Sequence, residues 1–587
     1  MKPLPSHLTG GHFLLTETDP SLVFTPEDLS TEERQIMDSA EKFMDKEVFT
    51  RLEALEHQEP GLAVKLFKQI GELGLHALEV PEEYGGLGLG KIASTGVAQQ
   101  LSRLGGFGVT CGAHTGIGSM PTTYFGTAAQ KQKYLPRLAT GELMAAYCLS
   151  ETGSGSDALG MKTKATLSAD GKHYLLNGTK MWITNAGWAD VFTVFAKVDG
   201  EHVTAFLVER TFPGVSFGKE EHKLGIKTSS TRRVILENAE VPVENVIGGV
   251  GKGAYIAFNI LNFGRYSLGA GAVGGSADML RTATKYAMER HQFGRPLASF
   301  GLIQQKLGDM AARIFAVDSA AYRTAANIDA VMATGETMDL TNPPFPRGME
   351  EMAVECSIIK VTCSEALYYV TDEALQIHGG YGFTEEFTPA RASRDARINR
   401  IFEGTNEINR LFITSTLLRR AQKGRFPIPT APEKFVPAAT DAEPLQKVES
   451  VLRGAKQLSL LLTGIAVKKF GDKFAEQQEV VAAISDMVME IYLDESALLR
   501  TRKALSKGRS AGTMTDLTLA LMNDSVSRLE QRAATVLAAC TDGEELQRSL
   551  ELSRRLLTWT PLNLIEVRRR IAARLCDVGN YPALVGG

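Results

Sequence analysis

The sequence predicts a multidomain α+β fold with an N-terminal helical domain, a central β-barrel-like domain, a C-terminal helical bundle and an additional C-terminal helical domain. Apolar residues recur at helical spacing towards both ends of the 587-residue chain, whereas alternating residues and turn dipeptides mark its middle. The chain is 44% hydrophobic, so it can bury several cores. Its formal net charge of -4 provides no polybasic surface for nucleic acid.

The first region, residues 28–146, is expected to be helical. It opens with two sequences of the capping-box type, Thr25–Asp28 and Ser30–Glu33, and a stripe of apolar residues at helical spacing follows from Ile36 to Leu55. The glycine-rich stretch Tyr84–Gly90 has no strand before it, so we interpret it as a loop and not as a nucleotide-binding motif.

Residues 147–250 are expected to form the β-domain. Two hairpins are predicted, one around Asn177-Gly178 and one around Asp199-Gly200, because Asn-Gly and Asp-Gly pairs favour two-residue turns. The paired segments would be Tyr174–Leu176 with Thr179–Thr184, and Val191–Val198 with His202–Glu209. The glycine-rich stretch Gly248–Gly253 lacks the spacing of a phosphate-binding loop, and we interpret it as a hinge.

Helical spacing resumes over residues 253–425, the predicted bundle, with a proline-rich loop at Thr341–Pro346. Residues 426–444 are too rich in proline for a helix or a central strand and are predicted to be a linker. Residues 445–587 form the additional helical domain, in which Leu458–Val467 is expected to pack in a bundle rather than on a membrane. A chain that ends before the linker is therefore expected to fold.

The sequence favours a location of the protein in the reducing cytoplasm of a bacterium. The N-terminus lacks an apolar signal core and has no arginine before Arg34, and the longest apolar run is half the length of a membrane-spanning helix. The six cysteines form no CxxC pair and no Cys/His spacing typical of zinc, so no metal site is predicted.

The most informative stretch is Arg400–Arg410, where Glu403 follows Ile401 and Phe402 and precedes Gly404. Burial among apolar groups would raise the pKa of the carboxyl group and make its anion a stronger proton acceptor. Taken alone, a glutamate beside a glycine is more often a solvated turn residue. Two further segments favour the catalytic interpretation.

The first is Tyr147–Ala158, which matches the dinucleotide fingerprint GxGxxA only superficially, because alternating residues follow it where a helix should open. The segment offers hydroxyl groups that suit the polar rim of a flat heterocycle, at Ser150, Thr152, Ser154 and Ser156. The second is Trp182–Thr184, which adds an aromatic face and a hydroxyl donor. A flavin needs both.

These segments resemble the acyl-CoA dehydrogenase family. Tyr147–Ser156 is similar to its first flavin signature, and the stretch from Gln376–Gly382 through Arg394–Arg397 to Phe402–Thr405 is similar to its second. The resemblance covers residues 28–420 in the order helical, β and helical. The additional helical region resembles the very-long-chain branch, whose members are dimers associated with membranes.

The resemblance implies that Glu403 removes the α-proton of an acyl-CoA thioester while the β-hydrogen leaves as hydride to FAD, giving the trans-2-enoyl-CoA. The backbone N–H of Glu403 would polarise the thioester carbonyl. Some members place the base at the position of Gly264, which cannot accept a proton here. Electron-transfer flavoprotein would receive the electrons.

The resemblance also implies the binding residues. Those of the cofactor are Tyr147, Leu149, Ser150, Ser156, Trp182, Ile183, Thr184, Arg290, Gln292, Gln376, Gly379, Gly380, Thr405 and Asn406. Those of the substrate are Ser156, Asn262, Arg265 and Gly404. Arg290 and Gln292 match positions that hold the FAD diphosphate across a subunit interface, so a homodimer is expected.

Small residues at Val109–Ala113 resemble the floor of a deep acyl pocket, which predicts a preference for long chains in fatty acid β-oxidation. Peripheral membrane contact through residues 445–587 would fit such a substrate. Two alternatives stay open: an acyl-CoA oxidase, in which oxygen reoxidises the flavin, and a respiratory-complex assembly or scaffold protein of the same fold.

Overall fold

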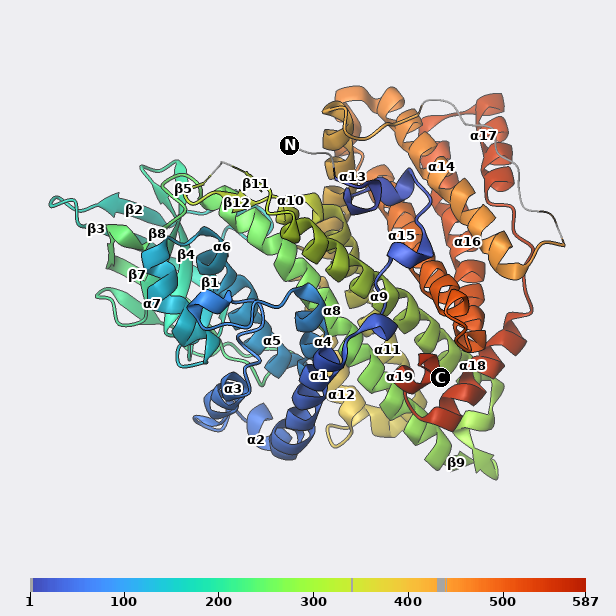
Figure 1. Ribbon diagram of the computed structural model, residues 1–587, viewed down its shortest axis with the longest axis horizontal. Coiled ribbons are helices and arrows are strands. Elements are labelled where there is room, and N and C mark those ends of the chain that lie inside the picture. The colour runs from blue at the N-terminus through green and yellow to red at the C-terminus, as the bar shows by residue number, and fades with distance from the viewer. Residues whose placement is uncertain (1–3, 339–340, 430–438, 440, 587) are drawn as a thin grey trace.

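The computed structural model describes residues 4–338, 341–429, 439 and 441–586. Pro432 and Pro437 of the predicted linker lie outside these residues. Figure 1 shows a β-sheet at one end of the molecule and the C-terminal helices at the other. Three long helices lie between them, α8 (Gly253–Glu289), α9 (Gly301–Ala333) and α11 (Ala353–His378).

The N-terminal region is helical, as predicted. Its α-helices are α1 (Thr31–Phe43), α2 (Leu52–Glu56), α3 (Leu62–Glu72), α4 (Lys91–Leu101), α5 (Gly105–Ala113), α6 (Met120–Phe125) and α7 (Ala128–Ala139). Both capping boxes are present, at Thr25–Asp28 and Ser30–Glu33. Tyr84–Gly90 leads as a loop into α4, whose first N–H groups donate to the carboxylate of Asp329. These two hydrogen bonds anchor the start of α4 to α9.

The central domain contains one eight-stranded sheet. Its strands are β1 (Ala145–Cys148), β2 (Lys164–Leu167), β3 (His173–Thr184), β4 (Val191–Val198), β5 (His202–Glu209), β6 (Val215–Phe217), β7 (Thr231–Pro242) and β8 (Val246–Ile247). Alternate residues of β4 face two different cores: Phe192 and Val194 pack in the core of the N-terminal helices, and Val191 and Phe195 in that of the helical bundle. The sheet therefore separates the two cores.

One predicted hairpin is wrong. Asn177-Gly178 is not a turn, because β3 continues through it from His173 to Thr184 with a bulge against β7. The Asn177 amide exchanges two hydrogen bonds with Asn238 of β7, and a Cβ on Gly178 would lie 2.4 Å from the hydroxyl of Thr163. The glycine permits this close approach between strands.

The second predicted hairpin is confirmed. β4 and β5 pair from Val191 opposite Glu209 to Val198 opposite His202. The loop between them has three residues, Asp199, Gly200 and Glu201, and not the two that were expected; Asp199 and Gly200 have φ of 52° and 78°.

The remaining helices complete the bundle and cover it. They are α10 (Gly348–Glu351), α12 (Thr388–Arg397), α13 (Asn406–Gln422), α14 (Pro444–Phe470), α15 (Gln478–Ser506), α16 (Gly512–Cys540), α17 (Gly543–Leu556), α18 (Leu564–Val578) and α19 (Tyr581–Val585). In the apolar stretch of α14, Leu458 and Leu462 are buried in the same core as the bundle helices α8, α9 and α11. Residues from before and after the proline-rich stretch therefore share one apolar core.

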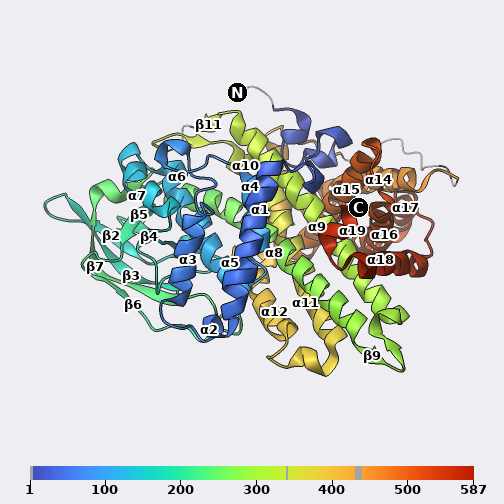
Figure 2. The same cartoon turned by 60° about the horizontal axis from the view of Figure 1, so that its bottom comes forward.

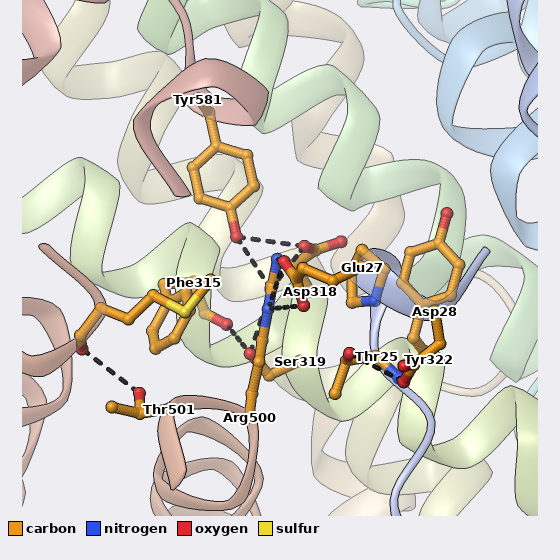
Figure 3. A network of polar contacts seen from close by, with 12 residues as sticks. Thr25, Glu27, Asp28, Phe315, Asp318, Ser319, Tyr322, Arg500, Thr501 and Tyr581 are labelled. Carbon is orange, nitrogen blue, oxygen red and sulfur yellow. Dashed lines mark hydrogen bonds and ion pairs between the residues drawn. The ribbon is translucent and has the colours of Figure 1, made fainter. Parts of the chain in front are cut away.

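Buried charges also join the C-terminal helices to the rest of the chain. Arg500 of α15 reaches Asp318 of α9 at 2.8 Å and Glu27 of the N-terminal segment at 2.6 Å, and Tyr581 donates to Asp318 (Figure 3). Figures 1 and 2 show the N-terminal segment, in blue, running beside α15. The expectation that a chain ending before the linker would fold is therefore not supported by the packing.

Two negative findings concern the described residues only. None of their helices combines the length and the apolar character needed to cross a bilayer. No group of three or more His, Cys, Asp or Glu side chains among them is arranged to hold a metal ion.

Candidate functional site

Glu403 lies in a two-residue left-handed turn immediately before α13. Glu403 and Gly404 have φ of 59° and 77°, and a positive φ is costly for a glutamate unless the surroundings hold it. Thr405 then caps α13 by accepting the N–H of Ile408. The turn ends the preceding helical stretch and directs the Glu403 side chain towards α8.

The Glu403 carboxyl group is placed to act as a base. Its Oε2 is buried and has no hydrogen-bond partner among the described residues. Burial raises the pKa of Glu403 to about 7, although the positive charges of Arg265 and Lys360 act in the opposite direction. A Cβ on Gly264 would lie 2.8 Å from this oxygen, so the glycine makes room for the carboxylate.

On one side of Glu403 lies an apolar cavity of about 190 Å³, lined by α4, α5, the turn after α5 and α8. Val109, Cys111, Gly112 and Ala113 of the predicted pocket floor line it. A Cβ on Gly112 would meet no atom within 4 Å. The cavity can therefore take an extended apolar chain whose end lies beside the carboxylate.

On the other side lies a larger cavity of about 990 Å³ that shares Thr184 and Glu403 with the first. It brings together most of the residues predicted to bind cofactor and substrate. Those that line it are Tyr147, Leu149, Ser150, Ser156, Trp182, Ile183, Thr184, Asn262, Arg265, Glu403 and Gly404.

The aromatic wall of this cavity depends on a strand irregularity. The pairing of β3 with β7 shifts between Lys180 and Ile183, and Trp182 has φ of 55°. A bulge of this kind turns a side chain out of its strand, and 59% of Trp182 is exposed. The structure thus holds an aromatic face and the Thr184 hydroxyl beside each other at the cavity.

A buried cluster fixes the loop that follows β1. Glu151 accepts hydrogen bonds from the backbone of Lys162, from Thr163 and from the ammonium group of Lys180. Ser154 donates to backbone carbonyls within the same loop and is 1% exposed. The expectation that Ser154 lies on the polar rim is wrong, whereas Ser150 and Ser156 line the cavity.

Other predicted cofactor residues lie elsewhere. Arg290, Gln292, Gly379 and Gly380 line a separate cavity of about 470 Å³. Gln376 is exposed on α11 and is not among the lining residues of any of these cavities. Two further predicted residues make hydrogen bonds within the protein: the Thr405 hydroxyl caps α13, and Asn406 is 1% exposed between Ser364, Glu365 and Lys360.

Sequence reasoning missed two side chains that hold the turn of Glu403. Lys360 donates to the carbonyl of Gly404, and Asn409 donates to the carbonyls of Glu403, Gly404 and Thr405. The available signal was a single lysine inside the apolar run Ile358–Val361 of α11. A charge in such a run needs a buried partner.

Four family models match this chain. They are described as the acyl-CoA dehydrogenase N-terminal domain (residues 30–142), middle domain (146–239) and C-terminal domain (251–418), with a second C-terminal domain model at 454–555. A probable acyl-CoA dehydrogenase of Bacillus subtilis is 44% identical over 97% of this chain and 98% of its own length. The chain belongs to the acyl-CoA dehydrogenase family.

Two further family members are informative. The very long-chain specific enzyme of human mitochondria is 44% identical over 355 residues, which are 58% of this chain and 51% of the human protein. The crystal structure of an acyl-CoA dehydrogenase from Bacillus anthracis, complexed with FAD, is 47% identical. It covers 98% of this chain and 100% of its own, with a TM-score of 0.94.

Proposed function

We propose that the protein is an FAD-dependent acyl-CoA dehydrogenase that converts long-chain acyl-CoA thioesters to trans-2-enoyl-CoA in fatty acid β-oxidation and passes electrons to an electron-transfer flavoprotein. The observation that carries this proposal is the position of Glu403. Its buried carboxylate lies where an apolar cavity meets a larger cavity with an aromatic wall. This arrangement joins a proton acceptor, an acyl site and a flavin site.

The residues present fit FAD. Trp182 gives the larger cavity an exposed aromatic face, and Thr184 and Ser150 give it hydroxyl groups. These three residues would hold the ring system of FAD, which accepts the hydride when it is bound. The relative with FAD in its crystal structure matches over nearly the whole chain, which supports this assignment.

Glu403 would take the α-proton of the substrate on its buried Oε2. The apolar cavity excludes water from that oxygen, and this strengthens both the base and the electrostatic interactions around it. The N–H of Glu403 would donate to the thioester carbonyl, where negative charge develops as the proton leaves. Gly264 leaves the space that the carboxylate occupies.

The preference for long acyl chains rests on the cavity at Gly112. Its open backbone and apolar walls leave depth beyond the reacting carbons. Each buried methylene contributes about 0.8 kcal/mol, so affinity should increase with chain length until the cavity ends. The similarity to the very long-chain specific human enzyme supports the same assignment.

We further propose a homodimer in which the cavity at Arg290 and Gly379 takes the adenosine diphosphate part of FAD from the partner subunit. Phe293 and Phe383 lie within a few positions along the chain of residues that line this cavity, and they are 92% and 83% exposed. Exposed aromatic side chains are typical of subunit contacts. The proposed domain limits, the bacterial cytoplasmic location and the peripheral membrane contact stay predictions.

Anaerobic titration of the purified yellow protein with acyl-CoA of increasing chain length tests the proposal. We expect loss of flavin absorbance, greatest with long chains. Absence of bleaching with every chain length would refute the activity and favour the assembly or scaffold alternative. Reoxidation of the reduced enzyme is then compared in air and with electron-transfer flavoprotein, and rapid reoxidation by oxygen would indicate an acyl-CoA oxidase.

A further inference from the structure

Lys360 is a buried lysine without a carboxylate partner among the described residues. It is 0% exposed, and its Nζ donates to two neutral acceptors, the carbonyl of Gly404 and the Oδ1 of Asn406, each at 2.7 Å. Its neighbours Ile359 and Val361 are also 0% exposed. A buried charge without an ion pair is costly, so this position calls for a specific role.

The role follows from what Lys360 holds. Three side chains from three helices bind the carbonyls of the left-handed turn: Arg265 of α8 and Asn409 of α13 donate to Glu403, and Lys360 of α11 donates to Gly404. A strained turn keeps its geometry only when its surroundings determine it. Asn409 also donates to the carbonyl of Gly404. Lys360 differs from Asn409 because its hydrogen bond to this carbonyl comes from a group that carries a positive charge.

Asn406 fixes the direction of the lysine. Its Oδ1 accepts a hydrogen bond from Lys360, and its amide NH₂ group donates to Ser364 and Glu365, which lie on α11 together with Lys360. Lys360 lines neither of the two cavities that meet at Glu403, so it contacts neither the acyl chain nor the flavin site. It therefore acts on the reaction through the Glu403 turn.

We propose that Lys360 is a positioning residue for the base: its ammonium group fixes the Glu403–Gly404 turn, and its positive charge favours the anionic form of the Glu403 carboxyl group. This inference rests on the proposed function of Glu403 as the proton acceptor. It assigns to one lysine both the orientation of the base and part of the stabilisation of its anionic form.

The charged groups around the pair support the electrostatic part. Arg265 and Lys360 both lower the pKa of Glu403, whereas Tyr147 faces it without charge because burial raises the pKa of the phenol. Burial lowers the pKa of Lys360 to about 7 and Arg265 acts in the same direction, while Glu403 and two further carboxylates, Glu407 and Glu365, raise it. Each charge thus stabilises the other.

The test compares the wild-type holoenzyme with Lys360→Met and Lys360→Gln. Methionine removes both the charge and the hydrogen bonds, and glutamine can donate to Gly404 without charge. Lys456→Met is the matched control, because Lys456 is also a buried lysine but binds Glu495 and the carbonyl of Thr16 far along the chain from the Glu403 turn. Rapid anaerobic flavin reduction is measured against pH.

We expect Lys360→Met to slow flavin reduction about tenfold or more and to move the acidic limb of its pH profile to higher pH, because the carboxylate loses a nearby cation. Lys360→Gln should recover part of the rate and keep the shifted limb. Lys456→Met should lower thermal stability and leave the pH profile unchanged. A wild-type pH profile in both Lys360 variants would overturn the proposal, even if the rate falls.

A second readout does not depend on turnover. The infrared band of the protonated carboxyl group that disappears in Glu403→Gln reports the titration of Glu403 in the resting holoenzyme. We expect its midpoint to rise in both Lys360 variants, and an unchanged midpoint would overturn the inference. If wild-type flavin is not bleached by acyl-CoA, the proposed function fails, while this titration still decides the effect of Lys360. Should Lys360→Met not fold, Lys360→Gln carries both comparisons.

Discussion

At the scale of single residues, the pKa of Glu403 results from opposing influences on one carboxyl group. Loss of water raises its pKa to about 7, whereas the nearby cations Arg265 and Lys360 prevent a larger rise. A base with a pKa near the working pH combines a sufficient anionic fraction with a strong tendency to accept a proton. This compromise gives the first two predictions.

Replacing Glu403 by glutamine should abolish flavin reduction by acyl-CoA and preserve cofactor binding. The amide has nearly the shape of the carboxyl group but cannot accept the α-proton. Flavin content is measured by absorbance and reduction by anaerobic stopped flow. If this variant kept more than a few per cent of the wild-type rate, the base would have to be another residue.

Flavin reduction in the wild-type enzyme should depend on pH through Glu403. The pKa of about 7 means that the active anion is lost as pH falls, so the rate should drop about tenfold for each pH unit well below 7 and level off above it. The free enzyme is followed through kcat/KM. A flat profile from pH 5 to pH 8 would contradict a raised pKa at this site.

The sequence was sufficient to propose Glu403 as the base, because its apolar neighbours and the following glycine suit a buried carboxylate and the flavin-type segments resemble the family's signatures. It was not sufficient for Lys360 or Asn409. Asn409 lies only four to six positions after the carbonyls that it binds, but an asparagine at that place does not by itself indicate which carbonyls it reaches. Lys360 reaches the turn from α11, and no local pattern encodes its hydrogen bond to Gly404, 44 positions away. Such partners depend on how helices pack.

At the scale of elements, α5 contributes to the depth of the cavity proposed to hold the acyl chain. Gly112 faces open space at the cavity, whereas a Cβ on Gly108 of the same helix would lie 2.7 Å from the backbone of Ser102. The helix thus uses one glycine for depth and another for close packing. Added volume at Gly112 should enter the substrate site without displacing the protein.

We expect Gly112→Leu to shift the preferred acyl-CoA to shorter chains. A leucine would fill the space of several methylene groups, each worth about 0.8 kcal/mol of binding, so kcat/KM for long chains should fall by more than tenfold while short chains are less affected. Gly512→Leu, an exposed position in α16 with no atom near its Cβ, is the control for adding leucine to a helix. An unchanged chain-length profile would argue against this cavity as the acyl site.

The predictions of elements were correct where nearby residues in the sequence determine the structure, and wrong where residues from another strand determine it. The capping boxes at Thr25 and Ser30 involve residues three positions apart and were found from sequence. Asn177-Gly178 has the composition of a turn, yet Asn238 and Thr163 make it a bulge within β3. Long-range partners of this kind override turn propensity.

At the scale of the whole molecule, the C-terminal helices are part of one core with the bundle. Arg500 is 1% exposed and is surrounded by the carboxylates of Asp318 and Glu27 (Figure 3). Arg502, two residues along the same helix, binds Glu443 and Glu449 with 27% of its side chain exposed. The two arginines form a matched pair, one buried and one solvated.

Arg500→Met should destabilise the protein by about 3–5 kcal/mol, because the buried carboxylates of Asp318 and Glu27 lose their cation. Arg502→Ala should cost about 1 kcal/mol or less, since its ion pairs are solvated. Thermal unfolding of both variants under identical conditions measures the difference. Equal effects would mean that the buried network contributes no more than surface pairs do.

Deletion of residues 427–587 should prevent the remaining chain from folding to a soluble flavoprotein. The truncation removes Arg500, the cation that faces Asp318 and Glu27, and exposes the apolar surface of α9 against which α15 and α18 pack. Solubility and flavin content of the truncated chain are the measurements. A soluble, yellow truncated protein would show that the bundle is independent of its covering helices.

The ion pair between Glu27 and Arg500 also has a consequence for synthesis on the ribosome. Its two residues are 473 positions apart. At a translation rate of about 5–20 residues per second, Arg500 is therefore synthesised roughly 25 to 95 seconds after Glu27. During that interval the N-terminal segment lacks the surface of α15 on which it lies in the finished protein. We expect residues 4–28 to be the last part of the N-terminal region to become protected from proteolysis in stalled nascent chains, after Arg500 has left the exit tunnel.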